Sequence, residues 1–124
     1  MFSIRRETDY AIRLLKALDK SKGDLVLSLN EVSKDTKISF LFLQKIARKL
    51  RLAGIIEALQ GVEGGYRLKI DSEKISLKKI IEVTEGKCCI FDCSDEQNSP
   101  PQKNLKKINK KIIKILEQTK LSQI

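Results

Sequence analysis

The segment that most restricts the fold of this chain is residues 38–68, ISFLFLQKIARKLRLAGIIEALQGVEGGYRL, in which a helical pattern leads into a glycine-rich hairpin. The helical part places apolar residues at the i, i+3, i+4, i+7 spacing of a helix with one buried face. This stripe consists of Leu43, Ile46, Ala47, Leu50 and Gly54. Two short strand-like runs follow, residues 55–59 and 66–70, around a turn that contains Gly61, Gly64 and Gly65. The segment therefore predicts a helix followed by a two-stranded β-wing.

Capping signals mark the starts of the helices around this segment. Ser39 directly precedes the apolar stripe and is a candidate N-cap for its helix. Ser28 is followed three residues later by Glu31, which is the pattern of a capping box. Residues 8–18 show the same helical spacing, with Thr8 as the candidate cap. Three helices ahead of a wing indicate a winged helix-turn-helix, so the predicted fold is mainly α-helical with a small β-wing.

The rest of the chain divides by composition. Residues 76–86 form a further short helical pattern, which completes a predicted domain over residues 1–86. Residues 87–102, KCCIFDCSDEQNSPPQ, are rich in cysteine, acidic and polar residues and predict a cysteine-containing loop. Residues 103–124 contain a long amphipathic helix, expected at residues 104–121. Its apolar stripe is Leu105, Ile108, Ile112, Ile115 and Leu116.

The C-terminal helix has few apolar residues left in its own chain to pack against. A symmetric homodimer, in which two such helices bury each other's apolar stripes, accounts for it with the fewest assumptions. The alternative is that the helix folds back onto its own domain. A dimer also places two recognition helices on half-sites about one turn of DNA apart.

The charge distribution indicates a polyanionic partner. The chain has 25 Lys and Arg against 16 Asp and Glu, a formal net charge of +9. No acidic residue occurs in residues 38–56, whereas Lys45, Arg48, Lys49 and Arg51 lie close together there. Positive charge of this kind suits nucleic acid or an acidic surface. Because these cations lie on a helix that leads into a wing, we interpret the chain as a protein that binds double-stranded DNA.

We expect the DNA contacts at the amino end of the third helix, on its basic face and on the wing. Lysine and arginine neutralise phosphates without sequence preference, while the first turn of such a helix reaches base edges. Glutamine binds adenine through two hydrogen bonds, and phenylalanine packs on a thymine methyl group. Glycines let the wing turn and approach the DNA backbone closely, and Arg67 or Gln60 can enter the minor groove. The expected contacts are Ser28, Ser39, Phe40, Phe42, Gln44, Lys45, Arg48, Lys49, Gln60, Gly61, Gly64, Gly65, Tyr66 and Arg67.

Four stretches, TDYAIRLLKAL, SLNEVSKDTKIS, FLQKIARKLRLAGIIEALQGVEGGYRL and ISLKKIIEVTEG, resemble a family of bacterial winged-helix transcription regulators. The family is typified by the iron–sulfur cluster regulator IscR, the nitric-oxide-sensitive repressor NsrR and the cysteine-metabolism repressor CymR. The resemblance covers residues 8–86, and its wing motif GxxGGYRL is fairly specific. It implies a homodimeric regulator with a long dimerisation helix, whose third helix and wing contact operator DNA. The chain departs from the family at Gln60, often arginine there, and at Gly61-Val62, often Gly-Pro.

Three cysteines, Cys88, Cys89 and Cys93, lie within six residues of the expected loop. Their odd number and close spacing are a poor framework for disulfides. Thiolates are ligands for iron–sulfur clusters and for zinc, so a metal or redox role is indicated. The spacing is no zinc signature, because the chain has no histidine and no second CxxC. Packing or incidental thiols are the alternative.

The family resemblance implies a ligand set for these cysteines. Sensor members of the family hold a 2Fe-2S or 4Fe-4S cluster with three cysteines of this loop and a residue near the N-terminus. By that analogy Asp9, in the sequence Thr8-Asp9-Tyr10, is the expected fourth ligand and Glu7 the second choice. An acidic residue in a first helical turn is also favoured by the helix dipole alone. The C-C-x3-C spacing departs from the family, so a thiol redox switch without a cluster stays open.

Other classes of function have less support in the sequence. No run approaches the roughly 18 apolar residues of a membrane span, and MFSIRRETDY lacks the long apolar core of a signal peptide. We therefore expect a cytoplasmic protein with no membrane partner. Without a histidine, a nucleophile elbow or a phosphate-binding loop, the chain is not expected to be an enzyme. A winged-helix module for RNA or protein binding is the alternative to a DNA-binding regulator.

Overall fold

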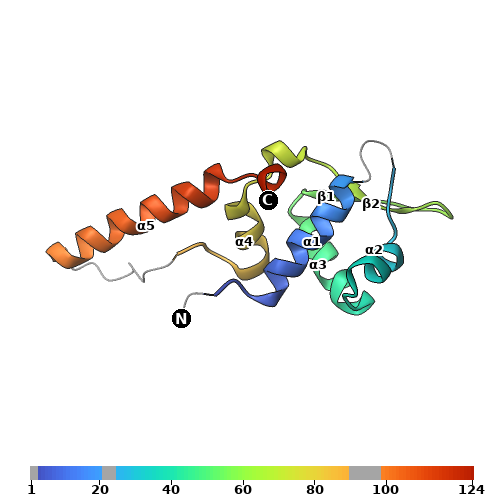
Figure 1. The fold of residues 1–124 in the computed structure, drawn as a ribbon, viewed down its shortest axis with the longest axis horizontal. Coiled ribbons are helices and arrows are strands. Elements are labelled where there is room, and N and C mark those ends of the chain that lie inside the picture. Colours follow the sequence, from blue (N-terminus) through green and yellow to red (C-terminus); the bar gives the residue numbers. More distant parts are fainter. Residues whose placement is uncertain (1–2, 21–24, 90–98) are drawn as a thin grey trace.

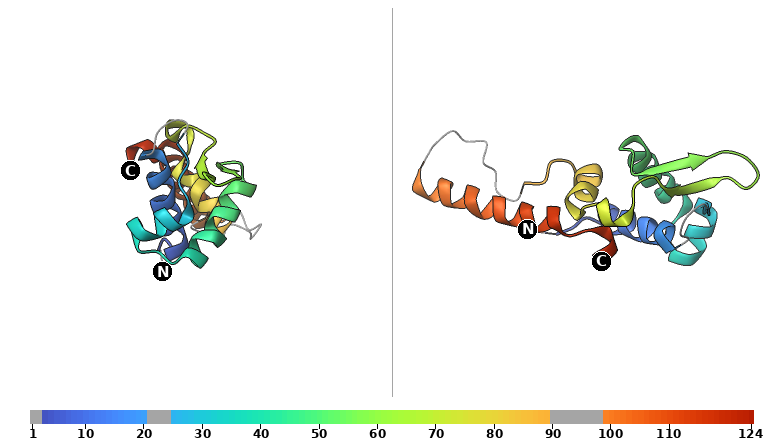
Figure 2. Two further views of the ribbon diagram at one scale, coloured as in Figure 1. Left: turned by 90° about the vertical axis from the view of Figure 1, so that its right-hand side faces the viewer. Right: turned by 90° about the horizontal axis from the view of Figure 1, so that it is seen from above.

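The computed structural model describes residues 3–20, 25–89 and 99–124 (Figure 1). Its helices and strands are α1 (Arg6–Lys20), α2 (Leu29–Thr36), α3 (Phe40–Leu52), β1 (Ile56–Leu59), β2 (Gly65–Leu68), α4 (Leu77–Glu85) and α5 (Pro100–Gln118). Two short 3-10 turns, η1 (Ser72–Lys74) before α4 and η2 (Leu121–Gln123) after α5, complete the described elements. The wing formed by β1 and β2 lies at one end of the molecule, and α5 projects from the other end (Figures 1 and 2). This arrangement confirms the expected mainly α-helical fold with a small β-wing.

The hydrophobic core lies where α1 packs against α3 and α4. Leu14 and Leu15 of α1 and Ile80 of α4 are completely buried in it. Four of the five residues of the predicted stripe, Leu43, Ile46, Ala47 and Leu50, are confirmed as buried, each with 0% exposure. The fifth, Gly54, lies beyond the end of α3 and is half-buried. Burial of one such leucine or isoleucine contributes roughly 1.5–3 kcal/mol. The core therefore determines which face of α3 is left to solvent.

The predicted caps of α2 and α3 are confirmed. The Ser28 hydroxyl accepts a hydrogen bond from the Glu31 amide at 3.2 Å, and the Glu31 side chain accepts one from the Ser28 amide at 3.4 Å. The Ser39 hydroxyl accepts from the Phe42 amide at 3.2 Å. Ser76 caps α4 in the same way. These hydroxyls satisfy amides that have no partner inside their helices, so the caps fix the start of each helix.

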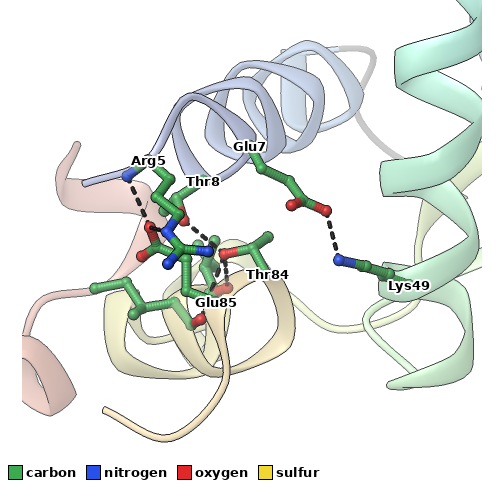
Figure 3. A network of polar contacts seen from close by, with 8 residues as sticks. Arg5, Glu7, Thr8, Lys49, Thr84 and Glu85 are labelled. Carbon is green, nitrogen blue, oxygen red and sulfur yellow. Dashed lines mark hydrogen bonds and ion pairs between the residues drawn. The ribbon is translucent and has the colours of Figure 1, made fainter. Parts of the chain in front are cut away.

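The prediction that Thr8 caps the first helix is wrong. Helix α1 begins at Arg6, and Thr8 lies inside it with 0% exposure. Its Oγ1 lies 2.6 Å from Oγ1 of Thr84 on α4 (Figure 3). Because Thr84 Oγ1 also lies 2.9 Å from the Ile80 carbonyl, to which it donates, Thr8 is the donor to Thr84. Thr8 therefore bonds to a buried partner 76 residues away in the sequence and does not cap its own helix.

The wing is an antiparallel pair in which Ile56 lies opposite Leu68, and Glu57 opposite Arg67. The strands are close to the predicted residues 55–59 and 66–70. Leu27 adds a bridge on the other side of β2, with backbone hydrogen bonds to Tyr66 of 3.0 and 2.8 Å. This bridge connects the base of the wing to the segment before α2.

The glycines of the wing are needed within the chain itself, whatever they contact on DNA. A Cβ atom on Gly64 would lie 2.3 Å from the Leu59 carbonyl oxygen, and one on Gly65 would lie 2.5 Å from the Leu27 carbonyl oxygen. The sharp turn itself is at Gly61, whose φ is 118°. Gly64 and Gly65 are therefore required by the closeness of the chain's own backbone.

Helix α5 differs from its prediction at both ends. It begins at Pro100, so the last three residues of the predicted loop 87–102 are helical, as suits proline in a first turn. It ends at Gln118 instead of residue 121, because Leu121 donates its amide to the Ile75 carbonyl at 2.8 Å and is completely buried. No residue of α5 is buried. None of the described helices is long and apolar enough to cross a membrane.

Candidate nucleic-acid interface and cysteine segment

The solvent-exposed face of α3 carries one continuous stripe of side chains. Positions 41, 45, 48 and 52 are three or four residues apart, so they lie above one another on the helix surface. Lys45 and Arg48 occupy the middle of the stripe and are exposed. Leu41 and Leu52 lie at its two ends and are 77% and 74% exposed. Lys45 and Arg48 in the middle of the stripe suit an anionic partner, and Leu41 offers an apolar group at the amino end of the helix.

A shallow groove of about 430 Å3, here called the wing groove, lies between the start of α2, the exposed side of α3 and the wing. It brings together residues that lie far apart in the sequence and were expected to contact DNA, namely Ser28, Phe40, Gln44, Gln60, Gly65 and Tyr66. Phe40 is 37% exposed at its edge. Arg51, one of the cations of the predicted basic face, also lines it, as does Asn30, which was not among the expected contacts. Three elements therefore meet at one open surface.

Two of the expected contacts have partners on α1. The Phe42 ring packs edge-on against the Tyr10 ring of α1, with 5.1 Å between centroids and 81° between planes. Lys49 Nζ lies 2.6 Å from the Glu7 carboxylate of α1 (Figure 3). Phe42 and Lys49 are seven residues apart, so they share the side of α3 that faces α1. This spacing was present in the sequence and could have separated Lys49 from the outer cations.

The tip of the wing is open to solvent. Gln60 and Gly61 are exposed, and Val62 is fully exposed at 107%. Arg67 is half-buried further back, where it forms an ion pair with Glu57 on the opposite strand. The structure thus places Gln60 at the tip and Arg67 within the hairpin, with its charge partly compensated.

The two cysteines of the described chain differ in environment. Cys88 is buried and Cys89 is exposed. Both line a hollow of about 380 Å3 together with Glu85 and residues Ile112 and Leu116 of α5. Burial raises the pKa of the Cys88 thiol, and the nearby Glu82 carboxylate raises it further. The amide of Asn109 on α5 points to the Cys89 sulfur at 3.9 Å. Cys93 lies outside the described residues.

These environments predict unequal reactivity of the two thiols. In a Cys93→Ser background, we expect iodoacetamide at pH 7.5 to modify Cys89 about tenfold faster than Cys88, because the raised pKa and burial keep Cys88 protonated and covered. Peptide mass spectrometry of time points measures both rates. Equal rates would mean that Cys88 is not buried in solution.

The acidic residues proposed as a fourth cluster ligand have other partners. Asp9 lies 3.2 Å from the guanidinium of Arg13, one turn later on α1. Glu7 is held by Lys49. Among residues 3–20, 25–89 and 99–124, no three cysteine or acidic side chains come together as metal ligands. The described residues therefore do not fit an iron–sulfur cluster by themselves.

A polar network connects the segment before Cys88 to α3 through the first turn of α1 (Figure 3). The Arg5 amide donates to the Glu85 carboxylate at 2.7 Å, and Glu85 is the last residue of α4. The Thr8–Thr84 bond lies beside it, and the Glu7–Lys49 ion pair continues to α3. Three residues of α1 and its approach thus make these contacts: Arg5 and Thr8 with the end of α4, and Glu7 with α3.

The chain matches known proteins over this whole arrangement. The Rrf2 family, described as an iron-dependent transcriptional regulator, matches residues 4–124. The chain is 42% identical over 69 residues to the regulator IscR of Cereibacter sphaeroides, which covers 56% of this chain and 44% of that protein. It is 29% identical over 92 residues to the regulator NsrR of Shouchella clausii, covering 74% and 62% of the two chains. Its matches thus span between 44% and 62% of these relatives' lengths.

The solved structures give the same result. The chain superposes on CymR, the global cysteine regulator of B. subtilis, with a TM-score of 0.86 and 26% identity, over 99% of this chain and 95% of that one. The expected relationship to IscR, NsrR and CymR is therefore confirmed, and these relatives are named as regulators and not as enzymes. The chain belongs to the Rrf2 family of transcriptional regulators.

Proposed function

We propose that two copies of this chain bind duplex operator DNA through α3 and the wing and thereby regulate transcription. The observation that carries the proposal is that α3 is exposed along its basic stripe and also lines, through Phe40, Gln44 and Arg51, the groove that it shares with the wing. Lys45 and Arg48 are suited to phosphates, and Gln44 is suited to two hydrogen bonds with adenine. The backbone amides at the amino ends of α2 and α3, at Ser28 and Ser39, can donate hydrogen bonds to a phosphate.

The inward residues then have a supporting role. Phe42 and Lys49 fasten α3 to α1, so they set the orientation of the helix without contacting DNA. Lys49 is the natural control for Lys45 and Arg48, because it is a cation of the same helix with a different partner.

We test this division by the salt dependence of duplex binding. Replacing Lys45 and Arg48 together with alanine is expected to reduce the slope of log affinity against log salt by roughly 0.9 for each lost phosphate contact, or about 3.6 in a dimer. Lys49→Met is expected to leave the slope unchanged, because the Lys49 ammonium is held by Glu7. Fluorescence anisotropy of a labelled duplex at several salt concentrations measures both. An unchanged slope in the double variant, or an equal loss in Lys49→Met, would contradict the proposal.

We also propose that α5 forms the homodimer contact. Three residues of its apolar stripe are exposed, namely Leu105 at 37%, Ile108 at 44% and Ile115 at 62%. Water-exposed apolar residues at this regular spacing are typical of a helix that packs against a second one. The hollow beside Cys88 and Cys89 also includes α5 residues, so the dimer contact and the cysteine segment adjoin.

We further propose that the segment with Cys88, Cys89 and Cys93 senses a signal. The polar network from Glu85 through α1 to Lys49 supports a connection to α3. The family description is iron-dependent, and one similar protein is named a cysteine regulator, so we weigh both a cluster and a thiol switch as the form of control. The exposed Cys89 favours thiol chemistry in the described part of the chain.

Iron and sulfide analysis of protein purified without oxygen decides between these two forms of control. Thiol control predicts a colourless protein whose duplex affinity falls at least severalfold on mild oxidation and recovers with a reductant. A protein with stoichiometric iron and sulfide that Cys89→Ser removes would establish the cluster instead. Serine variants of all three cysteines that respond like the wild type would exclude both.

A further inference from the structure

The exposed leucine in the first turn of α3 has no function in the fold. Leu41 is 77% exposed, whereas Leu43 two residues later is completely buried. It directly follows Phe40, the first residue of the helix, and Ser39, its cap. The first turn of a helix that enters the major groove is the part that contacts base edges. A leucine there offers only apolar contact.

The structure also removes one of the expected apolar contacts to thymine. Phe42 is turned toward Tyr10, and Phe40 is only 37% exposed at the edge of the wing groove. Leu41 is the most exposed apolar residue of α3 and lies on the same stripe as Lys45 and Arg48. When Lys45 and Arg48 lie along the DNA phosphates, the stripe that they share with Leu41 faces the wall of the DNA major groove.

We propose that Leu41 is a specificity-determining residue that recognises thymine by packing on its 5-methyl group in the major groove. The inference rests on the proposed DNA binding and gives it a chemical preference. The C5-methyl group is the apolar feature of the major groove, and it distinguishes thymine from cytosine and from uracil.

The position of Gln44 makes the inference more specific. Leu41 and Gln44 are three residues apart on the helix surface, so their Cβ atoms are about 5–6 Å apart. Stacked base pairs are about 3.4 Å apart along each strand. The thymine that contacts Leu41 therefore lies within about two base pairs of the adenine that Gln44 binds. Each half-site is expected to contain this A·T-rich step.

The test removes the apolar group on each side of the contact: the 5-methyl group of thymine on the DNA and the isopropyl group of Leu41 on the protein. The probe is a duplex enriched from a random pool by the wild-type protein, with each thymine replaced in turn by deoxyuridine. We expect one thymine per half-site whose replacement weakens wild-type binding about fourfold, the effect of one buried methyl group. Leu41→Ala is expected to bind the original duplex with a similar loss and to be indifferent to that replacement.

Leu52→Ala is the matched control, because Leu52 is an equally exposed leucine at the other end of the same stripe. It should respond to deoxyuridine as the wild type does. If Leu41→Ala remains as sensitive as the wild type to every replacement, Leu41 does not recognise thymine, although the proposed DNA binding stands. If no duplex is enriched from the pool, the proposed function itself fails. Both leucines are exposed, so unchanged thermal unfolding verifies the fold of each variant.

Discussion

Aspartate at both Ile108 and Ile115 is expected to convert the protein to a monomer and to weaken binding to a duplex with two half-sites by roughly 100-fold or more. The two isoleucines lie seven residues apart on the exposed stripe of α5 and are 44% and 62% exposed in the single chain. In the proposed dimer they lie against a second copy, where an unpaired carboxylate costs several kcal/mol. Loss of the dimer removes the joint binding of both half-sites. Sedimentation velocity measures the mass, and anisotropy measures the affinity.

A matched control is available on the opposite side of the same helix. Lys107 and Lys114 are also seven residues apart and are exposed. Replacing both with glutamine lowers the charge of the chain by two, as the two aspartates do, but leaves the apolar stripe intact. This variant should remain dimeric. If the aspartate variant also remains dimeric, the copies do not meet through this stripe of α5.

Replacing Gly65 with alanine is expected to destabilise the protein by about 3 kcal/mol and to lower its Tm by roughly 10 °C. The added Cβ would lie 2.5 Å from the Leu27 carbonyl oxygen and 2.6 Å from its carbon, both backbone atoms that cannot rotate away. The bridge between Leu27 and Tyr66, with hydrogen bonds of 3.0 and 2.8 Å, must open to make room. Because this bridge holds the base of the wing, duplex binding should weaken as well.

Gly54→Ala separates this clash from the ordinary cost of losing a glycine. Gly54 has a φ of 76°, and nothing lies within 4 Å of a Cβ placed there. The alanine variant therefore loses stability only through its left-handed backbone conformation, which costs about 1–2 kcal/mol. Thermal unfolding by circular dichroism compares the two variants. A Gly65→Ala protein as stable as Gly54→Ala would show that the wing is not docked against Leu27 in solution.

The elements that the sequence predicted well are those set by local spacing. The stripe of α3 requires only the helical period, and the caps at Ser28 and Ser39 require only the next three residues. The residues that were misplaced depend on distant partners. Thr8 was predicted to be a cap because the local sequence does not reveal its partner, Thr84, which lies in another helix. The C-terminal end of α5 was extended too far because Leu121 pairs with the segment before α4.

In the structure, the residues expected at the interface divide between an exposed surface and the side of α3 that packs against α1. A charged helix read alone does not show which cations face a neighbouring helix, so Lys49 was grouped with Lys45 and Arg48. The acidic partner of Lys49 lies 42 residues earlier, on α1. Leu41 was overlooked because an exposed leucine becomes visible only when the packing of its neighbours is known. The roles of the cysteines, the dimer contact and the bases contacted stay predictions.

The measurement that tests the central claim most directly is enrichment of binding sites from a random pool of duplexes, followed by competition with single-stranded DNA and RNA. A dimer that binds through α3 and the wing predicts an inverted repeat whose half-sites are centred about 10 base pairs apart, or a multiple of that distance. Single strands should then compete weakly. A pool without an enriched symmetric site, or equal binding to single-stranded RNA, would contradict the account and favour an RNA-binding module.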